Sequence, residues 1–254
     1  MRYLWFLVFS ATLASATVAS EIEVAAGAEY FQWQEFNDSG RKLLEETGPR
    51  YFIGVKGTDR LENDWLIDFG WRFYSGTVDY DGETLPPNVR PVTTDTDYNG
   101  IRTELGFSNI VEDKPGAPDA TWLLRFALGV DYWRRSLQNT TLQDGTIVIG
   151  YVERYTTAYA KIGASYQYEG KWSLGIGAKA PLYTREEVGL NGGITLNPEG
   201  QLSLFADMDI PLNRVLSVAV AYDSYRFAKS DPEAGYQQPE STQDTVGLAL
   251  RYRF

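Results

Sequence analysis

The sequence predicts an all-β protein, built as a single closed antiparallel barrel that crosses a membrane with its strands. Apolar and polar residues alternate with period two through most of the chain beyond residue 20. The alternating segments are as long as a tilted membrane-crossing strand requires, roughly 9 to 11 residues. The links between them are alternately short and long. Ten strands fit this pattern, and eight or twelve are the alternatives.

The composition narrows the possible functions. The chain has 254 residues and a formal net charge of −11, which argues against an extended nucleic-acid surface. It has no cysteine, so neither a disulfide nor thiol chemistry is possible. It also has no histidine, which removes the commonest general base and the commonest metal ligand together. We therefore expect no cofactor and no metal.

The first twenty residues are predicted to be an export signal rather than part of the fold. Arg2 is followed by an apolar run from Tyr3 to Leu13 and then by small residues that suit a signal peptidase, with cleavage expected between Ala16 and Ser20. No later window contains about 18 apolar residues, so no membrane-spanning helix is predicted. The expected domain organisation is a removed signal at 1–20 and one barrel at 21–254.

Ten strands follow from the alternation. We place them at 22–36, 49–58, 65–77, 98–111, 121–134, 152–168, 172–183, 201–210, 215–227 and 244–254.

The connections alternate in length as regularly as the faces. Short links contain DRLEND, EDKPGAPD, EGK and PLNR, which carry the residues that tight turns require. Long polar links are expected at 37–48, 78–97, 135–151, 184–200 and 228–243. With an even strand number both termini lie on the short-turn side, as in bacterial outer-membrane barrels with short periplasmic turns and long extracellular loops.

The two faces of the strands differ throughout. One face is apolar, and Trp65, Trp122 and Trp172 each follow a short turn, where an aromatic girdle would meet lipid headgroups. The other face is charged and is predicted to line the lumen. Its residues are Glu23, Glu29, Arg50, Lys56, Asp68, Arg72, Arg102, Glu104, Arg125, Asp131, Glu153, Lys161, Lys179, Asp207, Asp209, Asp223, Arg251 and Arg253.

A soluble β-sandwich is the alternative that uses the same alternation. It would bury the apolar face between two sheets and leave the charges in water. It does not explain why the export signal, the alternating link lengths and the tryptophan positions occur together. A closed barrel explains all three, and it leaves no backbone group unpaired in lipid.

The closing sequence GLALRYRF, the N-terminal signal and the strand layout resemble the small Gram-negative outer-membrane β-barrel proteins of the OmpA and OmpX kind, over the whole mature length. In that group the last strand ends in an aromatic residue and is similar to the signal that the barrel-assembly machinery reads. Leu248, Leu250, Tyr252 and Phe254 match that pattern. The resemblance implies a bacterial outer-membrane location, with outer-membrane lipid, lipopolysaccharide and the assembly machinery as partners. We expect a monomer that binds no nucleic acid.

Catalysis is not expected. Omptin proteases as a family use an Asp and His couple beside paired aspartates, and barrel lipid-A deacylases and phospholipases use Ser and His, so this chain cannot assemble either set. Asp207 and Asp209 could exchange protons but suit the role of counter-charges to lumen arginines. An outer-membrane hydrolase without histidine is a distant alternative. Asp95 and Asp97 lack the remaining spacing of a calcium loop, so they are expected in a solvated acidic loop.

Two functions remain open for the charged lumen. Basic residues predominate on the second to seventh strands and acidic residues on the others, and Lys161 should lie nearly opposite Lys179. In one interpretation the charges pair, and the barrel is a plugged anchor with a structural or surface-interaction role through its loops. In the other they border a narrow, porin-like channel for small solutes. We favour the first, because ten strands lie close to the eight-stranded limit at which side chains fill the interior.

Three arginines interrupt the apolar face. Arg134, Arg154 and Arg226 fall at the long-loop ends of their strands, where the cost of placing arginine near lipid approaches zero. Either their guanidinium groups bind lipopolysaccharide phosphates, or they extend into water.

Overall fold

The computed structural model describes residues 21–61, 64–84, 89–111, 120–168, 170–190 and 193–254. The predicted signal at 1–20 lies outside the described residues. Within the described ranges the chain is all β, and no helix is long and apolar enough to cross a membrane.

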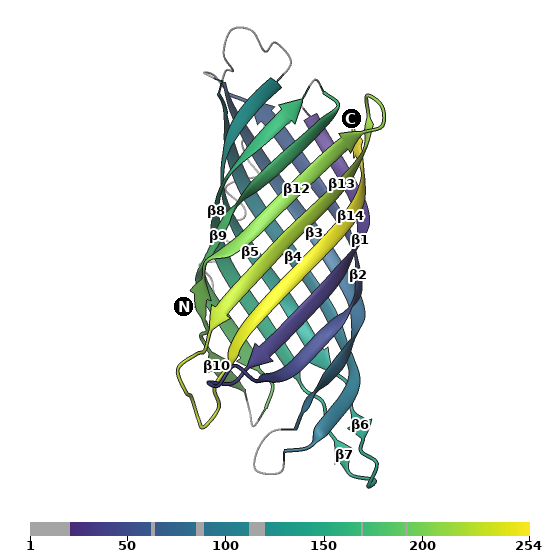
Figure 1. Ribbon diagram of the computed structural model, residues 1–254, viewed down its shortest axis with the longest axis vertical. Helices are drawn as coiled ribbons and strands as arrows, with labels where there is room; N and C mark the ends of the chain where they lie inside the picture. The colour runs from purple at the N-terminus through teal and green to yellow at the C-terminus, as the bar shows by residue number, and fades with distance from the viewer. Residues whose placement is uncertain (1–20, 62–63, 85–88, 112–119, 169, 191–192) are drawn as a thin grey trace.

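Ten long antiparallel strands close into one barrel, as predicted (Figure 1). They are β1 Glu21–Phe36, β2 Lys42–Arg60, β3 Trp65–Glu83, β4 Pro91–Val111, β5 Ala120–Leu137, β8 Val152–Tyr168, β9 Trp172–Val188, β12 Ser203–Pro211, β13 Leu216–Ala228 and β14 Glu240–Arg253. Each pairs with its neighbour in the ring, and β14 pairs with β1 to complete it. Ring closure leaves no sheet edge exposed to lipid.

Alternation along each strand sends apolar side chains outward and charges inward. Leu128, Ile176 and Leu248 are examples of large apolar side chains that are more than half exposed on the outer face, which only a lipid environment accommodates. Aromatic residues mark both ends of this apolar band. Trp65, Trp122 and Trp172 lie near the short turns, and Tyr30, Tyr51, Phe73, Tyr132, Tyr183 and Tyr222 lie towards the long connections.

The long connections are shorter than predicted, because the strands continue beyond the apolar band. The link expected at 37–48 is a turn at 37–41, since β2 begins at Lys42. Likewise β3 ends at Glu83 and β4 begins at Pro91. Asp95 and Asp97 therefore lie within β4 rather than in a loop. Strand pairing satisfies the backbone hydrogen bonds of these segments, and polar outer faces keep them soluble.

Four short strands lie in the long connections at this end of the barrel. β6 (Thr140–Thr141) and β7 (Ile147–Val148) form a hairpin that projects beyond the ring (Figure 1). Arg90 forms an ion pair with Asp144 of this hairpin. Hydrogen bonds from the side chain and backbone of Thr146, together with the Arg90 guanidinium, lower the pKa of the Asp144 carboxyl. β10 (Ile194–Leu196) pairs with β9, and β11 (Glu199–Gln201) pairs with β13.

Candidate functional site

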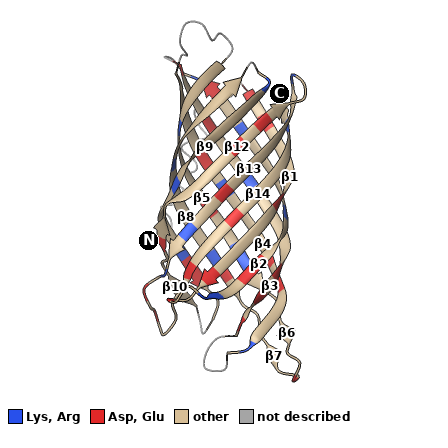
Figure 2. Ribbon diagram, viewed as in Figure 1, with Lys and Arg blue, Asp and Glu red and all other residues tan. Residues whose placement is uncertain are grey.

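Charged residues of both signs recur along the strands of the barrel wall (Figure 2). Those that the alternation pointed inward form ion pairs with one another across the lumen. A cavity of about 280 Å³ is lined by Glu23, Glu29, Lys56, Asp68, Arg72, Arg102, Glu104, Arg125, Lys161, Asp207, Asp223 and Arg251. Five of the remaining predicted lumen residues form ion pairs with members of this set, and they are Arg50, Asp131, Lys179, Asp209 and Arg253. The sixth, Glu153, pairs instead with Arg135, nearer the long connections.

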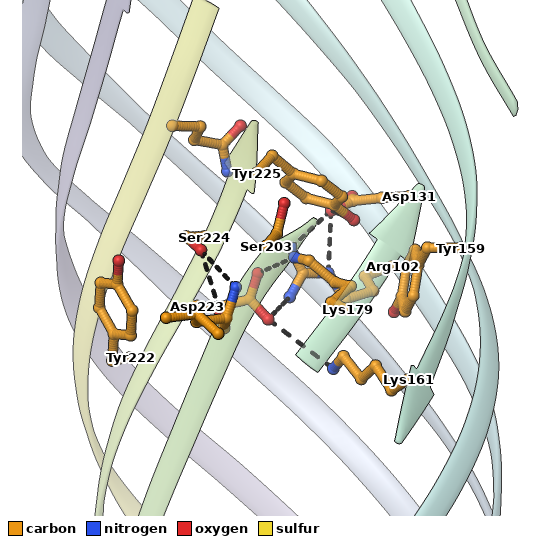
Figure 3. A network of polar contacts seen from close by, with 12 residues as sticks. Arg102, Asp131, Tyr159, Lys161, Lys179, Ser203, Tyr222, Asp223, Ser224 and Tyr225 are labelled. Atoms are coloured by element: carbon orange, nitrogen blue, oxygen red, sulfur yellow. Dashed lines mark hydrogen bonds and ion pairs between the residues drawn. The ribbon is translucent and has the colours of Figure 1, made fainter. Parts of the chain in front are cut away.

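A central ion-pair network forms around Asp223 of β13 (Figure 3). Lys161 and Lys179 lie directly opposite each other on β8 and β9, an arrangement that repels unless a carboxylate reaches both. Asp223 supplies that carboxylate: it pairs with Lys179, and its Oδ2 lies 3.7 Å from Lys161 Nζ. The same oxygen lies 3.4 Å from Nη1 of Arg102 on β4. One carboxylate thus holds cations from three strands.

Further partners balance the charge of this network. Asp131 accepts hydrogen bonds from Arg102 at 2.6 and 2.8 Å and from the Tyr74 hydroxyl at 2.8 Å. Glu104 lies 2.7 Å from Lys161 Nζ. The Lys179 ammonium is fully buried and lies 3.2 Å from the centre of the Tyr225 ring. Each buried charge therefore has an oppositely charged neighbour, as low-dielectric surroundings require.

Other ion pairs connect strands on different sides of the ring. Arg125 Nη1 of β5 lies 2.6 Å from Asp207 Oδ1 of β12. Glu29 of β1 pairs with Arg72 of β3 and, at 2.5 Å, with Arg50 of β2. The Arg125–Asp207 and Glu29–Arg72 pairs connect strands that share no backbone ladder, whereas Glu29 and Arg50 are register partners on neighbouring strands.

The seam between β14 and β1 has its own charge cluster. Glu23 and Arg253 are register partners. Arg253 lies 3.3 Å from Glu23 and 3.1 Å from Asp209, and Arg251 lies 3.5 and 3.4 Å from the same two carboxylates. Asp207 and Asp209 thus face different arginines rather than each other. The Phe254 N–H donates to the Ile22 carbonyl at 2.9 Å, which extends the seam to the last residue.

The cavity occupies the half of the lumen nearest the short turns. Small residues such as Ala25, Gly54 and Ala219 line it and leave the space that larger side chains would fill. Lys56 and Asp68 also line it, and within the described part of the chain neither forms an ion pair. Two charged groups are therefore open to solvent or to a small solute.

A cluster of nine aromatic residues and one valine is buried in the lumen beyond the cavity. Its members are Phe31, Trp33, Tyr74, Val78, Tyr98, Trp133, Tyr155, Tyr159, Tyr225 and Phe227. Trp133 and Tyr155 stack with their ring centroids 4.8 Å apart and their planes 4° from parallel. Trp33 is 1% exposed and Tyr155 is 0% exposed, so water has little access to this layer. We call these ten residues the aromatic plug.

A second buried cluster lies at the long-connection end, around Arg135 of β5. Its Nε donates to Glu46 at 2.9 and 3.0 Å, and its Nη1 donates to Glu153 at 2.5 Å. Glu35 lies 3.6 Å from the same Nη1, and Glu186 is fully buried beside these carboxylates. We call these five residues the Arg135 cluster. It connects strands β1, β2, β5, β8 and β9 near the barrel mouth.

Most of the Arg135 cluster was not predicted from the sequence, because residues 37–48, 135–151 and 184–200 were expected to be loops. Arg135 nevertheless continues the inward alternation of Asp131 and Trp133. Following that alternation past the end of the apolar face would have identified it.

Nonpolar side chains from the connections pack at the same end. Val188, Ile194 and Leu196 are buried together, with Tyr151, Leu190 and Tyr236 against them. The segment that carries β10 therefore packs back onto the barrel wall.

The three outward arginines have different surroundings. Arg134 and Arg154 are register partners on β5 and β8, and no ion pair to either forms among the described residues. Arg226 instead donates to Asp244 at 2.7 and 3.0 Å and to two backbone carbonyls. The Arg226 guanidinium is thus already neutralised within the barrel.

In the described ranges, no group of three or more acidic residues is arranged to hold a metal ion.

Comparison with known proteins gives similarity in structure but not in sequence. No protein-family model matches the chain, and no curated protein matches it. The outer membrane protease OmpT from Escherichia coli is similar in structure, with a TM-score of 0.55 and 14% identity over 93% of this chain and 98% of that one. Ail of Yersinia pestis, at 12% identity and a TM-score of 0.39, covers 92% of this chain and 98% of its own length. Neisserial surface protein A is 9% identical with a TM-score of 0.36, and the match covers 92% of this chain and 97% of that one.

At these identities the comparisons establish the fold alone. The chain is a small outer-membrane β-barrel: a closed ten-stranded ring with an apolar outer band and a charged interior. Its place is the bacterial outer membrane.

Proposed function

We propose that this protein is a closed, non-enzymatic barrel that acts at the cell surface through the extracellular extension of its strands. The proposal rests on the order in which layers of packed side chains follow one another along the lumen. Beyond the cavity the aromatic plug is followed by the Arg135 cluster, and nonpolar side chains pack at the mouth. Ten strands leave little room for a water path around such layers.

The extension itself supports a binding role. Paired strands hold β2, β3 and β4 beyond the apolar band, so the extracellular surface is built on sheet rather than on long loops. Rigid elements present a binding surface with less loss of conformational entropy than free loops do.

An acidic patch on this extension indicates the chemistry of a partner. Asp79 and Asp95 are direct register partners, and Asp81 lies two residues along β3. All three are exposed, and no basic side chain pairs with them among the described residues. Opposed carboxylates destabilise a strand pair, so their presence favours a basic partner that neutralises them.

Binding of a lysine-rich peptide to the folded barrel tests this role. Wild-type barrel should bind the peptide in a salt-sensitive manner, and the triple variant Asp79→Asn, Asp81→Asn, Asp95→Asn should bind it about tenfold more weakly. Asp38→Asn and Glu199→Gln alter exposed carboxylates elsewhere and serve as controls. Equal affinity of the triple variant and the wild type would show that the patch is not the binding surface.

A narrow channel for small solutes is the second candidate. The charged cavity, with Lys56 and Asp68 unpaired in it, favours this alternative. Electrical conductance distinguishes the two, because only a continuous water path passes ions.

A further inference from the structure

The lipid-facing surface carries a groove at the level of the long-connection aromatic residues. It has a volume of about 460 Å³ and lies over β2, β3, β4 and β5. Its lining is almost wholly apolar, and it consists of Tyr51, Phe52, Ile53, Phe73, Tyr74, Ser75, Asn99, Gly100, Ile101 and Tyr132. We call this feature the outer groove.

The groove follows from the size of the side chains in two neighbouring rows. Ser75 and Asn99 are register partners with short side chains, while Phe73 and Ile101 form the next outward pair below them. Gly100, between those positions on β4, faces the lumen, where a side chain would meet the Tyr74 ring, so only its backbone lines the groove. Large side chains at Tyr51 and Tyr132 flank the depression that results. Its shape and polarity suit a hydrocarbon chain.

The two arginines without ion pairs lie directly beside this groove. Asn99 of the groove is the register partner of Arg134, which in turn is the register partner of Arg154. The backbone places Arg134 two residues beyond Tyr132 of the lining, on the side away from the apolar band. An apolar slot therefore continues into a pair of guanidinium groups.

This pair has a cost that Glu187, the register partner of Arg154 on β9, offsets only in part, because the Glu187 carboxylate forms its ion pair with Arg185. Like charges directly opposite each other on neighbouring strands repel. The Arg134 Nε atom is buried and lacks a hydrogen-bond partner within the described residues. A buried donor that is left unsatisfied is destabilising, because it has lost its hydrogen bonds to water without replacing them. Arg226, on the other side of the barrel, differs from this pair because its guanidinium group forms an ion pair with Asp244.

We propose that the outer groove and the Arg134 and Arg154 pair together form a binding site for a phosphorylated lipid of the lipid A class. One acyl chain lies in the groove, and a phosphate accepts hydrogen bonds from both guanidinium groups. Guanidinium matches phosphate geometry and forms bidentate, charge-assisted hydrogen bonds with it. The acyl chain and the phosphate of the lipid contact different parts of the site. The contribution of each contact to binding can therefore be tested separately.

Binding of purified lipid A to the full barrel in detergent, followed by native mass spectrometry, tests the site. The variant Arg134→Ala, Arg154→Ala should bind lipid A at least tenfold more weakly than the wild type. Dephosphorylated lipid A should bind the wild type as weakly as lipid A binds that variant. Ser75→Phe fills the groove and should weaken binding of both lipids. Arg226→Ala is the matched control, because its guanidinium is already paired, and it should change binding less than twofold.

Three results would overturn the proposal. They are undiminished lipid A binding by the double arginine variant, undiminished binding of both lipids by Ser75→Phe, and displacement of the lipid by millimolar inorganic phosphate alone. Heat-modifiable migration on gels establishes that each variant is folded. The acidic patch plays no part in this site, so either proposal can fail without the other.

Discussion

At the scale of single residues, the lumen depends on a few carboxylates that each hold several cations. Asp223 is the clearest case, since Arg102, Lys161 and Lys179 all converge on it. Lys179 is fully buried, so it cannot exchange its ion pair for water. Loss of one partner from such a group leaves the other charges uncompensated.

Asp223→Asn is therefore expected to lower the free energy of unfolding by about 3–5 kcal/mol, measured by urea titration of the barrel folded in lipid vesicles. Asp38→Asn is the matched control, because it breaks an exposed ion pair with Lys229 and should change stability by less than about 1 kcal/mol. Equal effects of the two substitutions would mean that the Asp223 network contributes nothing beyond a surface pair.

At the scale of elements, we expect the last strand to combine packing in the barrel wall with a role in assembly. β14 pairs along its length with both β13 and β1. Phe254 follows it with a side chain that is 74% exposed and therefore makes few contacts within the barrel. A role for this ring in folded-state stability is consequently small, and a role in recognition during assembly accounts better for its presence.

Phe254→Ala should reduce the amount of barrel in the outer membrane several-fold, measured by fractionation of expressing cells, while the little that assembles has wild-type stability. Phe254→Tyr keeps an aromatic ring at the terminus and should restore assembly. Normal membrane levels of Phe254→Ala would refute the assembly role.

The strands also show what the sequence could predict. Period-two alternation located all ten, because lipid on one side and charge on the other impose a strict pattern. The strand ends nearest the long connections were placed too early, because beyond the apolar band both faces of a strand carry polar residues and the contrast between the faces fades. For that reason Arg135 and Glu46 went unnoticed, although each continues the inward alternation of its strand. Glu186 lies beyond a β-bulge at Leu182, which shifts the inward alternation of β9 by one residue and hides it from the period-two pattern. The outer groove could not be predicted, because it depends on register between strands.

At the scale of the whole molecule, the lumen contains a cavity at one end and packed side chains at the other. The cavity faces the short turns, while the aromatic plug and the Arg135 cluster fill the part towards the long connections. Cross-lumen ion pairs hold the wall around both parts. This layout suits a rigid support whose outer surfaces, the acidic patch and the lipid-facing groove, carry the interactions.

Single-channel recording in planar bilayers tests closure of the lumen most directly. The wild-type barrel should give no persistent ohmic step, because the aromatic plug interrupts the water path. As a positive control, a folded variant with Trp33→Ala, Trp133→Ala and Tyr225→Ala should show greater ion leakage than the wild type, since it removes three large side chains from the plug. A persistent ohmic conductance of the wild-type barrel would contradict the closed-barrel account and favour the channel.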